Sequence, residues 1–324
     1  MRPVRPVPPH LARRAFSRTE AIEAGITPRM LQHRRFVEVY PSVYRLEGVQ
    51  LDDRGRIDAA RRALPSDARI SHGTRLRLLG LDRGGLLPIH FTVARDLHLD
   101  ISGILLHRTA AMPANDGIAV GVEAAFIGYA AFARAIDQVV VGDWLLHRGH
   151  TTVEALLAFA HDQKWRPGAA EVIATVPLLD ARSRSMPESE TRVCLEVAGL
   201  PRPEVNLDLH DETGLFLGCG DLVYRLWKLL IEYEGGQHFS DARQIASDVD
   251  RYARFRRENW EYIQVTKRHL SQPKDMVRRV HRELVRRGYD GPAPAFGPGW
   301  ERLFKVPTQR RCRREVDPQP QTAR

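Results

Sequence analysis

The most constraining feature of this 324-residue chain is the segment DLVYRLWKLLIEYEGGQH, which spans residues 221–238. Two apolar runs flank a short turn at about residues 225–227, and this pattern predicts two adjacent β-strands joined by a hairpin. Side chains alternate between the two faces of a strand, so Glu232 and Glu234 share one face. The hairpin would set Asp221 almost opposite Glu232. The segment therefore predicts three carboxylates in one patch.

Crowded carboxylates repel one another, and a divalent cation such as Mg²⁺ or Mn²⁺ would relieve that repulsion. We therefore expect Asp221 and Glu232 to be metal ligands, with Glu234 or His238 accepting a proton from an attacking water. Gly235-Gly236 ends the second strand and would leave space beside the patch. The alternative is that the two glutamates form only the solvated face of an edge strand, followed by an ordinary glycine turn.

Short motifs follow one another through the last third of the chain: Ser185-x-x-Glu188-x-x-x-Arg192, Gly199-Leu200-Pro201, Asp221-Leu222, Ile231-Glu232-Tyr233-Glu234-Gly235, His238, Asp248-x-x-Arg251 and Asn259-Trp260 before Tyr262-Ile263-Gln264-Val265-Thr266. In this order they resemble the domain of unknown function 559 family, the Vsr-like branch of the PD-(D/E)XK nuclease superfamily. The resemblance implies a restriction-endonuclease-like mixed sheet and Mg²⁺-dependent hydrolysis of DNA. Its implied catalytic residues are Asp221, Glu232, Glu234, His238 and Glu188, supported by Gln237, Asp248 and Arg251.

Two positions depart from that pattern. Glu234 stands where the superfamily usually has lysine and where this branch more often has aspartate, and Asn259 stands where glycine is usual. An added methylene at a metal site can displace a ligand by about an ångström, which is enough to harm catalysis. The alternative function is therefore a non-catalytic DNA-binding regulator of antitoxin type that retains a degenerate nuclease fold.

Two roles are open for Glu188. Ser185 has the character of a helix N-cap, Pro187 fits the first helical turn, and Glu188 occupies the capping-box position. The carboxylate could therefore only cap its helix. In nucleases of the superfamily, by contrast, a glutamate on the first helix often faces the metal.

The N-terminal segment, residues 16–50, predicts a winged helix-turn-helix. Ser17-x-x-Glu20 is a capping box, Thr27-Pro28 starts a second helix, and residues 36–46 alternate like a hairpin. The segment resembles the N-terminal domain of AbiEi-type antitoxins, which implies DNA binding. The residues expected to contact DNA are Arg29, Gln32, His33, Arg34 and Arg35. The alternative is a small helical cap whose arginines are merely solvated.

Between these regions, residues 56–165 predict a middle α+β domain. Helices are expected at 57–64 and 74–81, strands at 88–94 and 101–107, and a long helical region at 124–146 interrupted near Gly142-Asp143. A further helix is expected to be capped by Thr151. The histidines of this region show no metal-ligand spacing and are expected to be surface or packing residues: His72, His90, His107, His147 and His150.

The last predicted domain covers residues 182–290. Its expected fold class is α/β (α+β), with a mixed sheet flanked by helices. After the hairpin we expect a helix at 241–258, a strand at 261–266 and a closing helix at 272–287. Lys267 and Arg268 follow that strand, where they could hold a scissile phosphate. Residues 1–15 and 291–324 are expected to be disordered basic tails.

Composition agrees with an anionic partner. The net charge is +9, but much of it lies in the terminal segments, with five arginines against one glutamate in residues 1–20. No long apolar stretch predicts a membrane span, and three widely spaced cysteines indicate neither a disulfide scaffold nor a zinc site, which suits the cytoplasm. The expected partner is DNA, and the antitoxin resemblance adds a toxin or a repair or defence protein as a candidate.

Overall fold

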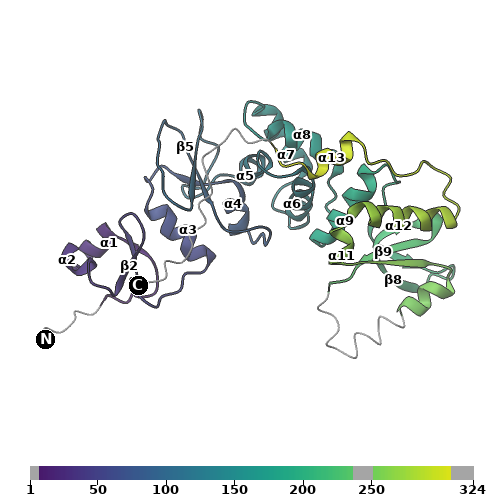
Figure 1. Cartoon of the computed structure of the whole chain (residues 1–324), viewed down its shortest axis with the longest axis horizontal. Coiled ribbons are helices and arrows are strands. Elements are labelled where there is room, and N and C mark those ends of the chain that lie inside the picture. Colours follow the sequence, from purple (N-terminus) through teal and green to yellow (C-terminus); the bar gives the residue numbers. More distant parts are fainter. Residues whose placement is uncertain (1–6, 236–250, 308–324) are drawn as a thin grey trace. The chain divides into compact units, whose positions relative to one another are not determined.

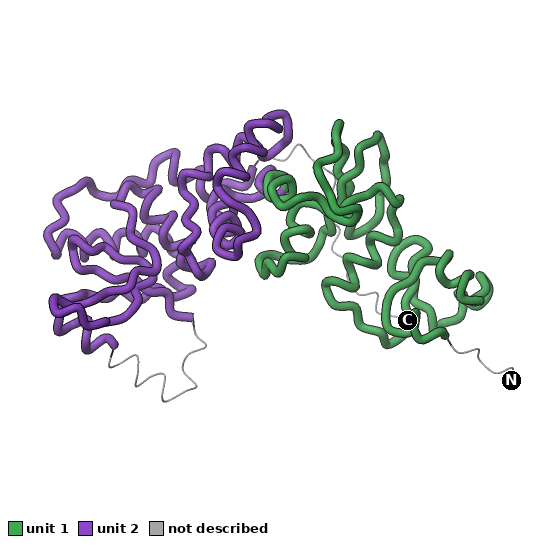
Figure 2. The backbone as a smooth tube through the Cα atoms, turned by 180° about the vertical axis from the view of Figure 1, so that it is seen from behind, with its two compact units in different colours: residues 1–128, 310–324 green, residues 129–309 purple. Residues whose placement is uncertain are grey.

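The computed structural model describes residues 7–235 and 251–307. The chain divides into two compact units, residues 1–128 with 310–324 and residues 129–309 (Figure 2). Both contain helices and strands, which confirms the expected α+β class. No helix in the described ranges is long and apolar enough to cross a membrane. The boundary lies within α5 (Val122–Ala130), so the segment 56–165 is not one structural unit.

Unit 1 begins with the predicted helices and hairpin (Figure 1). Its elements are β1 (Phe16–Ser17), α1 (Arg18–Glu23), α2 (Pro28–Leu31), β2 (Phe36–Tyr40) and β3 (Val43–Leu46). The strands form an antiparallel sheet in the order β1-β3-β2. Both expected N-caps are present, because Ser17 and Glu20 form a reciprocal capping box and Thr27 Oγ1 accepts from Met30 N. The local sequence therefore determined both helix starts.

The rest of unit 1 contains α3 (Asp53–Arg62), β4 (Arg69–Ile70), α4 (His72–Leu78), β5 (Ile89–Val93) and β6 (Ile104–Arg108). The sheet has the order β4-β5-β6, antiparallel between the first pair and parallel between the second. Ile57, Phe91 and Val93 are buried in the core between this sheet and α3. The expected helices and strands of this region are present within a few residues of their predicted positions.

Unit 2 begins with a helical portion that consists of α6 (Ala135–His147), α7 (Val153–Asp162), α8 (Ala169–Thr175), η1 (Val176–Leu178) and α9 (Met186–Val197). The interruption expected near Gly142-Asp143 is wrong, because α6 runs unbroken through both residues. Asp143 is buried and paired with Arg192 of α9, so its charge is compensated inside the helix packing. The cap of α7 is Thr152 rather than Thr151.

A four-stranded mixed sheet forms the second part of unit 2, in the order β10-β9-β8-β7. Its elements are β7 (Glu204–His210), β8 (Phe216–Tyr224), η2 (Arg225–Trp227), β9 (Leu229–Tyr233) and β10 (Glu261–Val265), followed by α11 (Lys267–Leu270), α12 (Pro273–Arg286) and α13 (Pro298–Phe304). The turn expected at residues 225–227 is η2. β9 pairs antiparallel with β8 and parallel with β10.

The two faces of this sheet pack against different helices. α9 contacts β8 and β9, and Figure 1 shows α9 and α12 along the same side of the sheet. Residues 251–257 are helical, and Phe255 packs with Val223 and Leu230, which lie opposite each other on β8 and β9. Because strand side chains alternate, this helix covers the face that also carries residues 221 and 232.

Parts of both expected tails are ordered. Leu11 and Ala15 are buried in the core of unit 1, although residues 1–15 were predicted to be a disordered tail. Near the other end, α13 buries Trp300 and Leu303, and Ala295 N donates to Ala198 O. A few apolar residues in each segment are buried and so hold it in place. The prediction missed them because it considered the basic character of each tail as a whole.

Candidate functional site

The two central carboxylates lie where β8 and β9 begin to separate. The antiparallel register pairs Leu222 with Ile231, so one step further along it sets Asp221 opposite Glu232 on the same face. Beyond this point a side chain replaces the backbone hydrogen bonds between the two strands, because Asp221 Oδ2 accepts a hydrogen bond from Tyr233 N at 3.1 Å. The position of Asp221 opposite Glu232 that the hairpin predicts is therefore present.

Asp221 is half-buried and has charged groups around it. Burial and, less strongly, the nearby Glu188 carboxylate raise its pKa to about 6, while the Tyr233 amide and Arg251 oppose the shift. Removing a carboxylate from water disfavours its charged form, and a second carboxylate nearby adds to that cost. The ionised form of Asp221 is therefore electrostatically unfavourable, and a bound cation or a proton would stabilise this carboxylate.

Glu232 is buried, with only 6% of its surface exposed, and it forms a close ion pair. Arg251 donates to both carboxylate oxygens, at 3.0 Å to Oε1 and 2.8 Å to Oε2. Tyr262 on β10 donates to Oε2 at 3.3 Å. Burial raises the pKa of Glu232 to about 7; Arg251 opposes that shift and Asp221 adds to it. Arg251 was expected only to support the site, but it contacts the ligand candidate directly.

Glu188 does more than cap its helix. Ser185 Oγ accepts from Glu188 N at 3.3 Å, as a capping residue should. The Glu188 side chain does not return to Ser185, because its Oε2 accepts from Arg184 N at 3.0 Å and from Asn206 Nδ2 at 2.8 Å. It is buried and acts electrostatically on Asp221. This arrangement agrees with the site-facing alternative.

The acids are clustered but do not converge tightly. Within the described ranges, the ligand atoms of Asp221, Glu188 and Glu232 do not all lie within 4.8 Å of one another. Hard cations bind carboxylate oxygens at about 2.0–2.6 Å, so three ligands would have to move closer together. The bidentate Arg251 contact would also have to open before Glu232 could bind an ion.

The remaining predicted site residues occupy three different situations. Glu234 lies just past β9 and is half-buried, and its backbone N donates to Val265 O at 2.8 Å. Lys267 and Arg268 are exposed at the start of α11, directly after β10. Because β9 and β10 are parallel, their C-terminal ends meet at the same edge of the sheet as Glu234. The predictions for Gln237, His238 and Asp248 lie outside the described residues.

Sequence reasoning missed two polar contributors to this site. Asn206 holds Glu188 and adopts a positive φ of 49°, and Tyr252 bonds Tyr262 at 2.7 Å between hydroxyls. Asn206 lies on β7 and Tyr252 on the returning helix, so neither belongs to the carboxylate motif. The asparagine at 259, where the family pattern has glycine, has φ 59°. Asparagine tolerates this left-handed conformation better than most residues, so the departure is conformationally mild.

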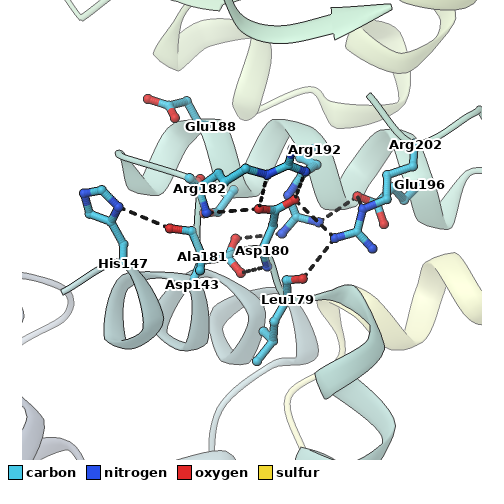
Figure 3. Close-up of polar contacts among 12 residues, drawn as sticks. Asp143, His147, Leu179, Asp180, Ala181, Arg182, Glu188, Arg192, Glu196 and Arg202 are labelled. Atoms are coloured by element: carbon cyan, nitrogen blue, oxygen red, sulfur yellow. Dashed lines mark hydrogen bonds and ion pairs between the residues drawn. The ribbon is translucent and has the colours of Figure 1, made fainter. Parts of the chain in front are cut away.

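Arg192, the last residue of the motif that begins at Ser185, belongs to a separate buried network (Figure 3). Its side chain is fully buried and bonds Asp143 of α6 and Glu196 of α9, each at 2.6 Å. Asp143 also accepts from Asp180 N at 2.7 Å. Exposed arginines extend the network, Arg182 to Asp180 at 2.9 Å and Arg202 to Glu196 at 3.5 Å. This network joins α6 to α9, the helix that carries Glu188.

In unit 1, four of the five expected DNA contacts are exposed around α2: Arg29, Gln32, His33 and Arg34. Arg35 is half-buried, with its guanidinium 4.7 Å from the Phe36 ring centroid. His33 Nδ1 accepts from Arg35 N at 3.3 Å, which folds the polar residues around the end of α2. The apolar partners Met30 and Leu31 pack inward, as predicted.

Comparison with known proteins does not indicate a function for this chain. No protein-family model and no solved structure matches the chain. Two uncharacterized proteins of Mycobacterium tuberculosis, from strains CDC 1551 / Oshkosh and H37Rv, are each 25% identical over 126 residues. The match covers 39% of this chain and 46% of each relative, so the chain spans about half the length of the curated relatives it matches. Any functional conclusion must therefore come from the site.

Proposed function

We propose that the protein binds DNA and hydrolyses its phosphodiester bonds with a divalent metal ion held by Asp221, Glu188 and Glu232. The observation that carries the proposal is the half-buried Asp221, which has a raised pKa and lies near the buried carboxylates of Glu188 and Glu232 at the end of a mixed sheet. Removing acids from water and crowding them together is costly, and acids whose pKa is perturbed in this way cluster at functional sites. An all-oxygen donor set of this kind fits Mg²⁺ or Mn²⁺.

Each neighbouring residue has a role in this proposal. A Mg²⁺ ion held by Asp221, Glu188 and Glu232 would stabilise negative charge on the phosphoryl oxygens and would lower the pKa of a bound water. Asn206 donates to the Glu188 carboxylate and so fixes it near Asp221, and Glu234 at the end of β9 accepts a proton from the attacking water. Lys267 and Arg268 sit at the same sheet edge and attract the DNA backbone. The exposed residues around α2 position the duplex.

The direct test is cleavage of supercoiled plasmid with Mg²⁺, Mn²⁺ or EDTA. The wild-type protein should nick or linearise the plasmid only with a metal ion, and Asp221→Asn should reduce the rate at least 100-fold. Asp275→Asn is the matched control, because Asp275 is an exposed carboxylate on α12 whose partner is Arg278. Equal cleavage by wild type and Asp221→Asn would point to a contaminating nuclease and reject this site.

One observation favours a second function, that of a non-catalytic DNA-binding regulator of antitoxin type. Arg251 already occupies both oxygens of Glu232, and such a pair neutralises the carboxylate without a metal. In a regulator, this ion pair would simply hold the helix at 251–257 against the sheet. Duplex binding without cleavage, unchanged by Asp221→Asn, would support this alternative.

A further inference from the structure

Three histidines that are far apart in the sequence meet in unit 1. His72 starts α4, His90 lies on β5 and His107 lies on β6. The parallel register pairs His90 with Leu105 and Thr92 with His107. His90 and His107 therefore lie on the same face of the sheet, on neighbouring strands, and are offset by two residues in the register. One ring nitrogen of each histidine lies within 4.8 Å of those of the other two. Among the described residues, this is the group whose geometry allows shared ligation.

The cluster is organised by specific contacts. His90 Nδ1 and His107 Nε2 are 2.9 Å apart and share a hydrogen bond. The His72 ring stacks on the His107 ring, with 3.7 Å between centroids and 12° between planes. All three side chains are half-buried. They are therefore held together while part of each remains accessible from outside.

His72 is positioned at some conformational expense. Its φ is 51°, in the left-handed region that residues other than glycine seldom adopt. A Cβ at Gly128 would lie 2.7 Å from His72 Nε2, so a glycine there leaves room for the imidazole. Outlying backbone conformations often accompany functional side chains, although the packing must maintain them.

The surroundings of His72 resemble the support of a metal-bound imidazole. His72 Nδ1 is 2.8 Å from Ser71 Oγ, which also accepts from Thr92 Oγ1 at 2.8 Å. Metal-bound histidines usually donate their second ring N–H to an oxygen, which fixes the ring orientation. If Nδ1–H donates to Ser71, the ring lone pair of His72 lies on Nε2, the nitrogen that would bind an ion.

We propose that His72, His90 and His107 bind a divalent transition-metal ion, with Zn²⁺ as the expected ion and water in the remaining position. Three imidazoles suit Zn²⁺, Co²⁺, Ni²⁺ or Cu²⁺ and not the hard ions Mg²⁺ or Ca²⁺. The site lies in unit 1, whereas the carboxylates of the proposed nuclease site lie in unit 2. It also differs from a cysteine-based zinc site, which the wide spacing of the cysteines does not indicate.

Binding requires a defined local rearrangement. Zn–N distances of about 2.0–2.1 Å in a tetrahedron separate the nitrogens by about 3.3 Å, so the His90–His107 hydrogen bond must open slightly. The stacked rings must also turn, because lone pairs in nearly parallel planes do not meet at one point. Rotation about χ2 of histidine is soft, so these changes need no new backbone conformation.

The test uses the full-length protein after EDTA treatment and buffer exchange. Titration with Co²⁺ should give one equivalent of a visible absorption band typical of tetrahedral nitrogen and oxygen ligands, which Zn²⁺ then displaces. A near-ultraviolet thiolate band should be absent, which excludes the cysteines. Mg²⁺ in large excess should not compete.

The informative variants are His72→Gln, His90→Gln and His107→Gln. Glutamine can keep one hydrogen bond but is a poor ligand for these ions, so each variant should bind Co²⁺ at least 100-fold more weakly. His98→Gln is the matched control: His98 lies on the exposed loop beside Asp96 and should leave binding unchanged. Glu232→Gln should also leave the Co²⁺ signal intact.

Two outcomes would overturn the proposal. One is the absence of stoichiometric Co²⁺ or Zn²⁺ binding by the wild type at micromolar concentrations, which would leave the triad as a hydrogen-bonded packing cluster. The other is equal binding by wild type and by two triad variants whose circular dichroism confirms that they are folded. If one variant fails to fold, the remaining two decide the question.

Discussion

The raised pKa of one residue, Asp221, predicts how the stability of the protein depends on pH. Its raised pKa means that the folded state favours the protonated acid. Stability from this group is therefore present at low pH and is lost as the pH rises from about 4 through about 6. Without metal, wild type should lose about 1–3 kcal/mol relative to Asp221→Asn between pH 4.5 and pH 8. Urea unfolding in EDTA at both pH values measures this difference, and a wild type that gains relative stability would contradict it.

The buried arginine gives a second prediction for one side chain. Arg192→Ala should destabilise the protein by about 3–5 kcal/mol, because Asp143 and Glu196 would stay buried without their shared partner. Arg182→Ala is the control: the Arg182 side chain is 59% exposed, and its removal should cost less than about 1 kcal/mol. Chemical denaturation of both variants gives the comparison. Equal destabilisation by the two variants would mean that the buried network contributes no more than a surface ion pair.

The same residues define what sequence alone can foresee. Strand alternation and hairpin length were enough to set Asp221 opposite Glu232, because both are local rules. The Arg251 pair was missed, since it depends on a helix that returns to the sheet after residue 250. The triad of His72, His90 and His107 was missed for a similar reason. Their spacing carries no pattern, and only the register of β5 with β6 brings two of them together.

Whole elements were foreseen where a local signal marks their ends. The capping residues Ser17, Thr27 and Ser185 each accept the expected hydrogen bond at the start of α1, α2 and α9. The interior of α6 was misjudged, because glycine and aspartate normally disfavour a helix. Tertiary pairing of Asp143 overrides that preference. Capping residues therefore predicted these helix starts well, whereas intrinsic propensity predicted the buried interior of α6 poorly.

The proposed DNA contact belongs to the scale of α2 and its flanking turn. Arg29→Glu with Arg34→Glu should weaken duplex binding and lower the salt dependence by about one ion for each phosphate that the protein no longer neutralises. Both residues are exposed, so the fold should tolerate the change. The control is Arg282→Glu with Arg286→Glu on α12, which alters net charge equally at exposed positions of unit 2. Mobility shifts at several salt concentrations supply the data, and identical slopes for the two double variants would exclude α2 from the interface.

At the scale of the whole molecule, two separate cores should unfold as two transitions. All five tryptophans, Trp144, Trp165, Trp227, Trp260 and Trp300, lie in unit 2, so tryptophan fluorescence reports on that unit while circular dichroism reports on both. Trp260 is buried beside Phe255 and Val223, and Phe91 is fully buried in the sheet core of unit 1. Each therefore tests one core.

Truncating either side chain leaves a cavity that costs about 3–5 kcal/mol. Trp260→Ala should move the fluorescence transition to a lower denaturant concentration. The part of the circular dichroism change that reports on unit 1 should stay at its wild-type concentration. Phe91→Ala should lower the denaturant concentration at which unit 1 unfolds, as seen by circular dichroism, and should leave the fluorescence transition unchanged. Additive effects in the double variant would follow from cores that share no residues. If each single variant instead shifts both signals together, the two units unfold as one cooperative body, and the division at residue 128 describes packing but not stability.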